Sequence, residues 1–310
     1  MATDSRLAPE EAFAALGNEL RVTVLRVLAE AAADAATDDE RGLSFTEIYD
    51  RVDIDSTSQL SYHLDKLDGM FVRRSPDGYR LTQAGDRVVR AVRSGTYTAT
   101  PTFPRTELDG RCHACRATTL VAEYRDPLLV VDCTACDTRV VTYDLPPAES
   151  VDRTPLEVLQ SCDQRVHHEY GMALQGTCAM CGGRTEVSTR TRDPPDDDAS
   201  TDDASTDGAP GYLCVAACRS CQHEVYAPLE VRLLYHPAVV SFYWQQGVDA
   251  STIPFWNVAT YLTDWRVDRV STDPDRFHVT VVYSDERLHL AVDDELAVSV
   301  RPPDANDSDA

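Results

Sequence analysis

Apolar positions in the first third of the chain follow two spacings. A helical repeat after Ser56 predicts a helix whose inward face is formed by Leu60, Leu64 and Leu67. Residues 71–72 and 79–81 alternate apolar and polar side chains, as half-buried strands do, and residues 75–78 between them have the composition of a tight turn. A second helical repeat predicts a helix over residues 83–94, with an apolar side formed by Val88, Val89 and Val92.

Residues at the predicted helix starts support these boundaries. Glu47 follows Ser44 by three residues and Gln59 follows Ser56 by three, which is the spacing of a capping box. Thr82 is placed to cap the helix that follows it. The sequence therefore predicts two short helices, a two-stranded ribbon and a further helix, and this order is that of a winged helix-turn-helix.

The main use of that module is to place one helix in the DNA major groove. Short polar groups on the open face of helix 56–67 can meet base edges and phosphates, and glutamine can bond adenine. Arginines beside the turn are placed to touch the phosphate backbone. We therefore predict a DNA-contact set that consists of Thr57, Ser58, Gln59, Ser61, Tyr62, His63, Lys66, Arg73, Arg74 and Arg80. The alternative is a winged helix used only for protein–protein contact.

Residues 8–94 resemble the ArsR-type winged-helix transcriptional regulators. The pattern of that family's opening helices is matched by Leu16, Gly17, Asn18, Arg21, Val24 and Leu25. The resemblance implies that Ser58, Gln59, Ser61, Tyr62 and His63 face DNA, and that a homodimer forms through residues 9–16 and 83–94. No cysteine precedes Cys112, so the arsenic- or metal-binding cysteine motif of some members is absent from this region.

Charge is distributed unevenly along the chain. The net charge is −23, with 36 Asp among the 52 acidic residues, and Lys66 is the single lysine among 29 basic residues. This composition resembles that of halophilic, haloarchaeal-like proteins, and molar salt reduces the screening length to about 3 Å. Residues 56–98 nevertheless carry a net charge of +3, which is the electrostatic footprint expected of a phosphate-binding face.

Eight of the ten cysteines form four C-x2-C pairs. Cys112, Cys115, Cys133 and Cys136 have seventeen residues between the two pairs, which is the spacing of a four-thiolate zinc site. A second set has thirty-six residues between its pairs and consists of Cys178, Cys181, Cys218 and Cys221. A closed four-cysteine site is by default structural, so we predict two zinc ribbons, each with one structural zinc ion.

Other arrangements of the thiols stay open. The pairs could form disulfides, act as redox dithiols, or combine across the two ribbons. Cys214 could replace Cys218 as a ligand, although a buried thiol is the favoured reading for Cys214 and for Cys162. The acidic run 193–208 is predicted to be a disordered insertion within the second ribbon.

The remaining sequence predicts a small α+β region at the C-terminal end. Helices are expected over residues 155–173, 238–246 and 255–262, and strands within residues 265–301. Aromatic residues gather in the last two helices, where a ligand pocket or a partner surface is the alternative to a plain core. The fold class is therefore multidomain α+β. Its expected parts are residues 1–98 (winged helix), 99–147 (linker and first ribbon), 148–228 (helix and second ribbon), 229–301 (α+β region) and 302–310 (disordered acidic tail).

These features favour a regulator over an enzyme, since no catalytic motif stands out. We expect a cytoplasmic, sequence-specific transcriptional regulator that binds double-stranded DNA as a homodimer, because no membrane-spanning run or signal peptide is evident. The alternative is an interaction factor of the basal transcription machinery, since initiation factor E also joins a winged helix to a zinc ribbon. A zinc-dependent enzyme or thiol oxidoreductase is a third possibility.

Overall fold

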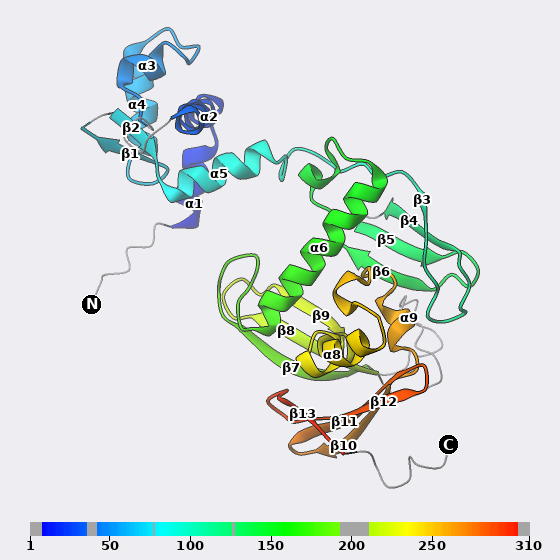
Figure 1. Cartoon of the computed structure of the whole chain (residues 1–310). Helices are drawn as coiled ribbons and strands as arrows, with labels where there is room; N and C mark the ends of the chain where they lie inside the picture. The colour runs from blue at the N-terminus through cyan, green and yellow to red at the C-terminus, as the bar shows by residue number, and fades with distance from the viewer. Residues whose placement is uncertain (1–7, 36–41, 77, 126–127, 193–210, 303–310) are drawn as a thin grey trace. The chain divides into compact units, whose positions relative to one another are not determined.

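The computed structural model describes residues 8–35, 42–76, 78–125, 128–192 and 211–302. The fold is mixed α+β, and the chain separates into two units, Met1–Thr100 and Pro101–Ala310 (Figure 1). The acidic insertion predicted at 193–208 lies outside the described residues, as does the predicted tail after residue 302.

The first unit contains helices followed by a two-stranded sheet and a last helix. Its helices are α1 (Pro9–Leu16), α2 (Glu19–Asp34), α3 (Phe45–Tyr49), α4 (Thr57–Leu67) and α5 (Gln83–Arg93). Strands β1 (Val72–Ser75) and β2 (Gly78–Leu81) pair antiparallel. The backbone of Leu43 pairs with Tyr79 in an isolated bridge, so the segment before α3 extends this sheet by one residue.

Apolar side chains from α2, α3, α4 and both strands form the core of the first unit. The predicted inward face of α4 is confirmed, because Leu60, Leu64 and Leu67 are fully buried. Gly85, in the first turn of α5, lies so close to Phe71 that an added Cβ would be 2.1 Å from the Phe71 carbonyl oxygen.

Two of the three helix caps predicted from the sequence are present in the structure. Ser44 and Glu47 form the predicted capping box, and the Thr82 hydroxyl accepts a hydrogen bond from the Gly85 N–H at 3.1 Å. The capping box predicted at Ser56 is wrong. Ser56 is the N-cap residue of α4, but its side chain makes no capping hydrogen bond.

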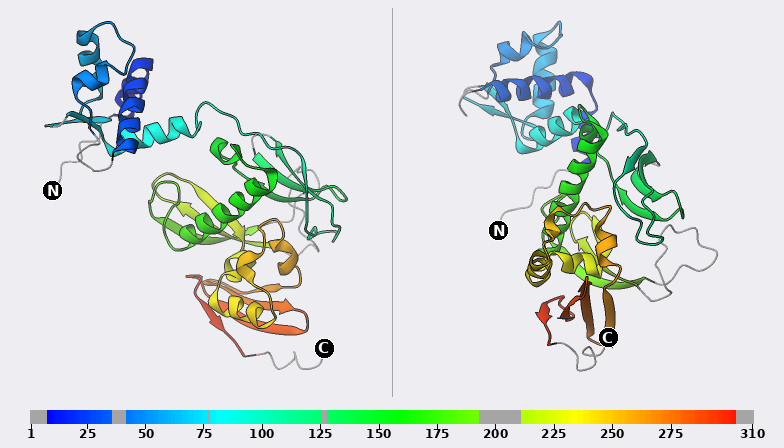
Figure 2. Two further views of the ribbon diagram at one scale, coloured as in Figure 1. Left: turned by 45° about the horizontal axis from the view of Figure 1, so that its top comes forward. Right: turned by 45° about the vertical axis from the view of Figure 1, so that its right-hand side comes forward.

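The second unit begins with an antiparallel sheet, a 3₁₀ turn and a long helix. The sheet has the strand order β3 (Thr106–Leu108), β4 (Leu120–Arg125), β5 (Leu128–Cys133) and β6 (Arg139–Tyr143). After the turn η2 (Pro147–Ser150), helix α6 (Pro155–Leu174) packs Val158, Leu159 and Cys162 into the core of this sheet. Both views in Figure 2 show α6 running alongside the sheets.

Two further antiparallel sheets complete the second unit. One contains β7 (Thr185–Arg192), β8 (Gly211–Cys218) and β9 (Glu224–Pro228), and the other contains β10 (Arg266–Thr272), β11 (Asp275–Tyr283), β12 (Glu286–Val292) and β13 (Val298–Val300). Short helices connect them: α7 (Leu229–Leu234), α8 (Pro237–Gln245), η4 (Ala250–Thr252) and α9 (Val258–Leu262). The helix predicted at 255–262 is therefore shorter than expected. Tyr243 and Phe277 lie in the core that these helices share with β11.

Candidate metal centres and a candidate nucleic-acid interface

The first cysteine group comes together around one point. Cys112 and Cys115 precede β4, while Cys133 ends β5 and Cys136 follows it. The Sγ atoms of Cys112 and Cys136 are 3.7 Å apart, and those of Cys115 and Cys133 are 3.6 Å apart. Four sulfurs at 2.3 Å from one tetrahedral zinc ion would be about 3.8 Å from one another. The group therefore has the size that a metal ion requires.

The second group has the same form and settles the choice between Cys214 and Cys218. The Sγ atoms of Cys178 and Cys221 are 3.7 Å apart, and those of Cys181 and Cys218 are 3.5 Å apart. Cys214 is fully buried in the core between the helices and the last sheet, outside the group. The pairs do not combine across the two ribbons, and each group could hold one metal ion.

All four C-x2-C pairs share a backbone turn that the spacing alone did not reveal. The N–H of the residue four positions after the first cysteine donates to that cysteine's carbonyl, at distances from 2.8 to 3.1 Å. The donor has a positive φ in each turn, and the four donors are Arg116, Asp137, Gly182 and Gln222. The repeated turn directs both sulfurs of a pair to one side.

Local dipoles favour the ionised form of one thiol in each group. Burial opposes ionisation of Cys133, but the Thr119 hydroxyl and nearby backbone N–H groups outweigh it and lower the pKa of this thiol to about 6. Backbone N–H groups of Cys221 and Ser220 lower the pKa of Cys218 to about 6. Burial raises the pKa of Cys112 to about 12, and, against the effect of a backbone N–H, the neighbouring thiols raise the pKa of Cys181 to about 12. One thiol of each group therefore ionises readily, and a bound cation would be needed to favour the thiolate form of the others.

The first unit carries polar side chains on the open side of α4. Thr57, Ser58 and Gln59 are exposed at the start of the helix, Ser61 is half-buried, and Lys66 is exposed near its end. Tyr62 is 56% exposed, and the Lys66 ammonium lies 5.6 Å from the centre of its ring. This side of α4 is therefore a continuous polar strip with one aromatic ring.

His63 is not on that strip. Its side chain is 7% exposed and belongs to the buried side of α4, so the prediction that His63 contacts DNA from the open face is wrong. Burial and the positive charge of Arg21 lower the pKa of the imidazole, so the neutral ring is favoured. The position follows from the helical repeat, because residue 63 lies three residues after Leu60 and four before Leu67.

The arginines of the β1–β2 hairpin lie in different surroundings. Arg73 is exposed and is the cross-strand partner of the half-buried Arg80. The Arg74 guanidinium lies 3.0 Å from the Asp65 carboxylate and 5.3 Å from the centre of the Tyr79 ring. Asp65 was not among the residues predicted from the sequence, although its place on α4 just before the hairpin is a signal for such a contact.

Together, these observations define a mixed α+β protein with two four-cysteine groups, each able to hold a metal ion. No helix in the described ranges combines the length and apolar character needed to cross a membrane.

Residues 109–298 match a domain of unknown function, DUF7351, over more than half of the 310 residues, so the chain belongs to this family. Residues 9–92 match a second domain of unknown function, DUF7347. Comparisons with curated proteins and with solved structures gave no match.

Proposed function

We propose that this protein is a sequence-specific transcriptional regulator that binds double-stranded DNA through residues 8–94. In this proposal, the first unit is a winged helix-turn-helix of the ArsR type, and α4 lies in the major groove. The β1–β2 hairpin contacts the phosphate backbone, while the two cysteine groups each hold a structural zinc ion.

The observation that carries the proposal is the exposed polar strip of α4 beside a basic hairpin. Gln59 and Tyr62 are accessible to base edges, and Arg73 is accessible to phosphates. Base contacts give sequence preference, whereas phosphate contacts give position and affinity. Residues 56–98 have a net charge of +3 in a chain of −23. Of this, +2 comes from α5 and +1 from α4 with the hairpin, so this part of the protein is favoured over the acidic remainder for contact with a polyanion. His63 is left out of the proposed contacts because it is buried.

The zinc proposal rests on the donor set of the two groups. Four thiols with sulfur separations between 3.5 and 3.7 Å suit a tetrahedral ion and leave no ligand position for a substrate. A zinc ion held by the four thiols of a group would cross-link the two turns of that ribbon. This supports a role in structure and, through the ribbon surfaces, in contact with a signal or with the transcription machinery.

The proposed assembly is a homodimer formed through α1 and α5. Phe13, on α1, is 74% exposed, and a large aromatic ring in that position is suited to burial against a second copy. A twofold dimer would bind two half-sites of a pseudo-palindrome. Light scattering of the purified chain tests this assembly directly.

The central test is selection of duplexes from a random pool by the zinc-loaded full chain in molar KCl. We expect enrichment of a short inverted repeat. Gln59→Ala should weaken binding to that site by about 1–3 kcal/mol and relax preference at one position, whereas Arg73→Ala should weaken binding to all duplexes and reduce the salt slope by about 1. Gln245→Ala removes an exposed glutamine of α8 and serves as the matched control.

The same experiment separates the proposal from the basal-factor alternative. Enrichment of no sequence, together with stable capture of RNA polymerase by the chain, would contradict a sequence-specific regulator and favour the alternative.

A further inference from the structure

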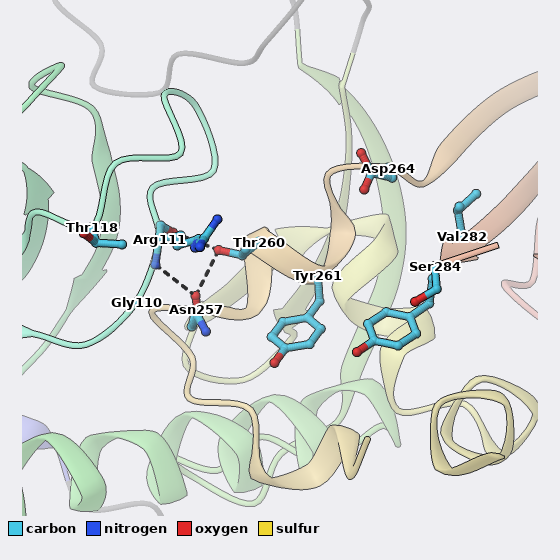
Figure 3. A pocket seen from close by; sticks show the side chains of 10 residues that line it. Gly110, Arg111, Thr118, Asn257, Thr260, Tyr261, Asp264, Val282 and Ser284 are labelled. Atoms are coloured by element: carbon cyan, nitrogen blue, oxygen red, sulfur yellow. Dashed lines mark hydrogen bonds between the residues drawn. The ribbon is translucent and has the colours of Figure 1, made fainter. Parts of the chain in front are cut away.

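A cavity of about 500 Å³ lies within the second unit, beside the first cysteine group. Three segments far apart in the sequence form its walls. These are the loops on either side of the first C-x2-C pair, helix α9 with the residues around it, and the end of β11 with the turn to β12. Figure 3 shows the side chains that line it: Gly110, Arg111, Thr118, Asn257, Thr260, Tyr261, Asp264, Val282, Tyr283 and Ser284.

Hydrogen bonds fix one wall of the cavity. The Asn257 side-chain oxygen accepts from the Arg111 backbone N–H at 3.3 Å, and the Thr260 hydroxyl donates to the Arg111 carbonyl at 2.8 Å. Gly110 permits this close approach, because a Cβ there would be 3.1 Å from Leu120 and 3.5 Å from Asn257. The wall is therefore held in place before any ligand binds, which reduces the entropy lost on binding.

Two tyrosine rings form an aromatic wall. The rings of Tyr261 and Tyr283 are nearly parallel, with an angle of 11° between them and 6.4 Å between their centres. Tyr243, which is fully buried, supports both: its hydroxyl donates to the Tyr261 carbonyl at 3.2 Å, and its ring meets Tyr283 at 5.2 Å. Trp265 donates in turn to the Tyr243 hydroxyl at 3.1 Å. These contacts hold the tyrosines in a fixed orientation.

The cavity also presents an available positive charge. Across the described part of the chain, the Arg111 guanidinium has no hydrogen bond or ion pair. The Asp264 carboxylate also lines the cavity, and Arg116 at 3.7 Å offsets part of its negative charge. In Figure 3, Arg111 lies beside Asn257 and Thr260, and the hydroxyl groups of Thr118 and Ser284 add further polar groups to the lining.

We propose that this cavity binds a small anionic molecule that consists of a planar ring bearing a carboxylate. The carboxylate would pair with the Arg111 guanidinium, and the ring would lie against Tyr261 and Tyr283. A guanidinium matches a carboxylate with two parallel hydrogen bonds, while fixed aromatic rings favour a flat partner. The volume is in the range of small-molecule sites. This inference goes beyond the proposed DNA binding and does not depend on it.

The test measures binding of simple probes to the zinc-loaded full chain in the absence of DNA. Benzoate, 4-hydroxybenzoate and nicotinate are compared by saturation-transfer NMR and calorimetry with two control probes: benzamide, which lacks the charge, and acetate, which lacks the ring. We expect saturable binding of the ring carboxylates at one site per chain, with benzamide and acetate weaker by about tenfold or more.

Variants then locate the site. Arg111→Gln should reduce affinity for the ring carboxylates by about tenfold or more, and Tyr283→Leu should weaken the ring carboxylates more than acetate. Arg184→Gln is the matched control, because it removes an exposed arginine three residues after Cys181 in the second ribbon. Zinc content and the melting temperature verify that each variant is folded. The inference is overturned if no ring carboxylate binds saturably, if benzamide binds as well as benzoate, or if Arg111→Gln and Arg184→Gln behave alike.

Discussion

The Asp65 carboxylate of α4 lies 3.0 Å from the Arg74 guanidinium of β1. The neighbouring Asp68 side chain accepts a hydrogen bond from the Arg74 backbone N–H at 3.2 Å. Two acidic groups at the end of α4 therefore hold the first strand of the hairpin. The same contact neutralises one of the arginines that we propose to lie near DNA.

Asp65→Asn tests this relationship. Both side chains of the ion pair are more than half exposed, so we expect the free energy of unfolding to change by less than about 1 kcal/mol. DNA affinity should rise by roughly two- to fivefold, because a repulsive charge is removed and Arg74 is released. Fluorescence anisotropy with the selected duplex measures the change. Asp86→Asn, which breaks the α5 pair with Arg90, is the control, and an equal gain in that variant would show that only net charge matters.

Gly85→Ala tests the close contact between α5 and the segment before β1. The new methyl group would lie 2.1 Å from the Phe71 carbonyl oxygen, which is backbone and cannot easily move. We expect the first unit to lose about 1–3 kcal/mol of stability, measured by thermal unfolding. At Gly17 the added methyl group would meet ordinary contacts at 3.6 Å or more, so Gly17→Ala is the control. Equal melting temperatures for the two variants would contradict the packing described.

Cys133→Ala and Cys162→Ala separate ligand cysteines from core cysteines. The full chain should contain two zinc ions by native mass spectrometry. Cys133→Ala should retain one, because three thiolates hold zinc more weakly than four. Cys162 lies in the core beside the same sheet, outside the metal groups, so Cys162→Ala should retain two ions with a modest loss of stability. Zinc loss from both variants would argue against the assignment of ligands.

His63 predicts a pH dependence of stability in the first unit. The pKa of the buried ring lies below its usual value, so near pH 6.5 the unfolded chain binds a proton more readily than the folded chain does. Stability from this group is therefore fully present above about pH 6.5, and is lost as the pH falls toward the lowered folded pKa. Melting temperatures of wild type and His63→Gln across this window measure the difference. If the melting temperatures of wild type and His63→Gln change in parallel with pH, the prediction is contradicted.

The first unit was largely predictable because its local signals agree with its packing. The helical repeat gave the buried face of α4, and serine–glutamate spacing gave the capping box at Ser44. The same spacing was wrong at Ser56, because spacing permits a hydrogen bond but does not require one. His63 was misplaced because its polar character was given more weight than its position between two buried leucines.

The sequence predicts the cysteine groups better than it predicts the cavity. Cysteine spacing predicts the four C-x2-C pairs, since each pair lies within one turn, but the structure was needed to show which two pairs form each group. The walls of the cavity combine Arg111 with Asn257, which are 146 positions apart, and only tertiary packing brings them together. The aromatic character of the C-terminal helices was visible in the sequence, but the arginine that lines the same cavity was not.

The indole of Trp256 donates to the Asp109 carbonyl at 3.2 Å, three residues before the first ligand cysteine and 147 positions away along the chain. A change in the structure of the first cysteine group should therefore alter the stability of the segment around α9. If the first group holds zinc as proposed, removal of the ion by a chelator is expected to speed amide exchange around α9, a segment that contains no cysteine.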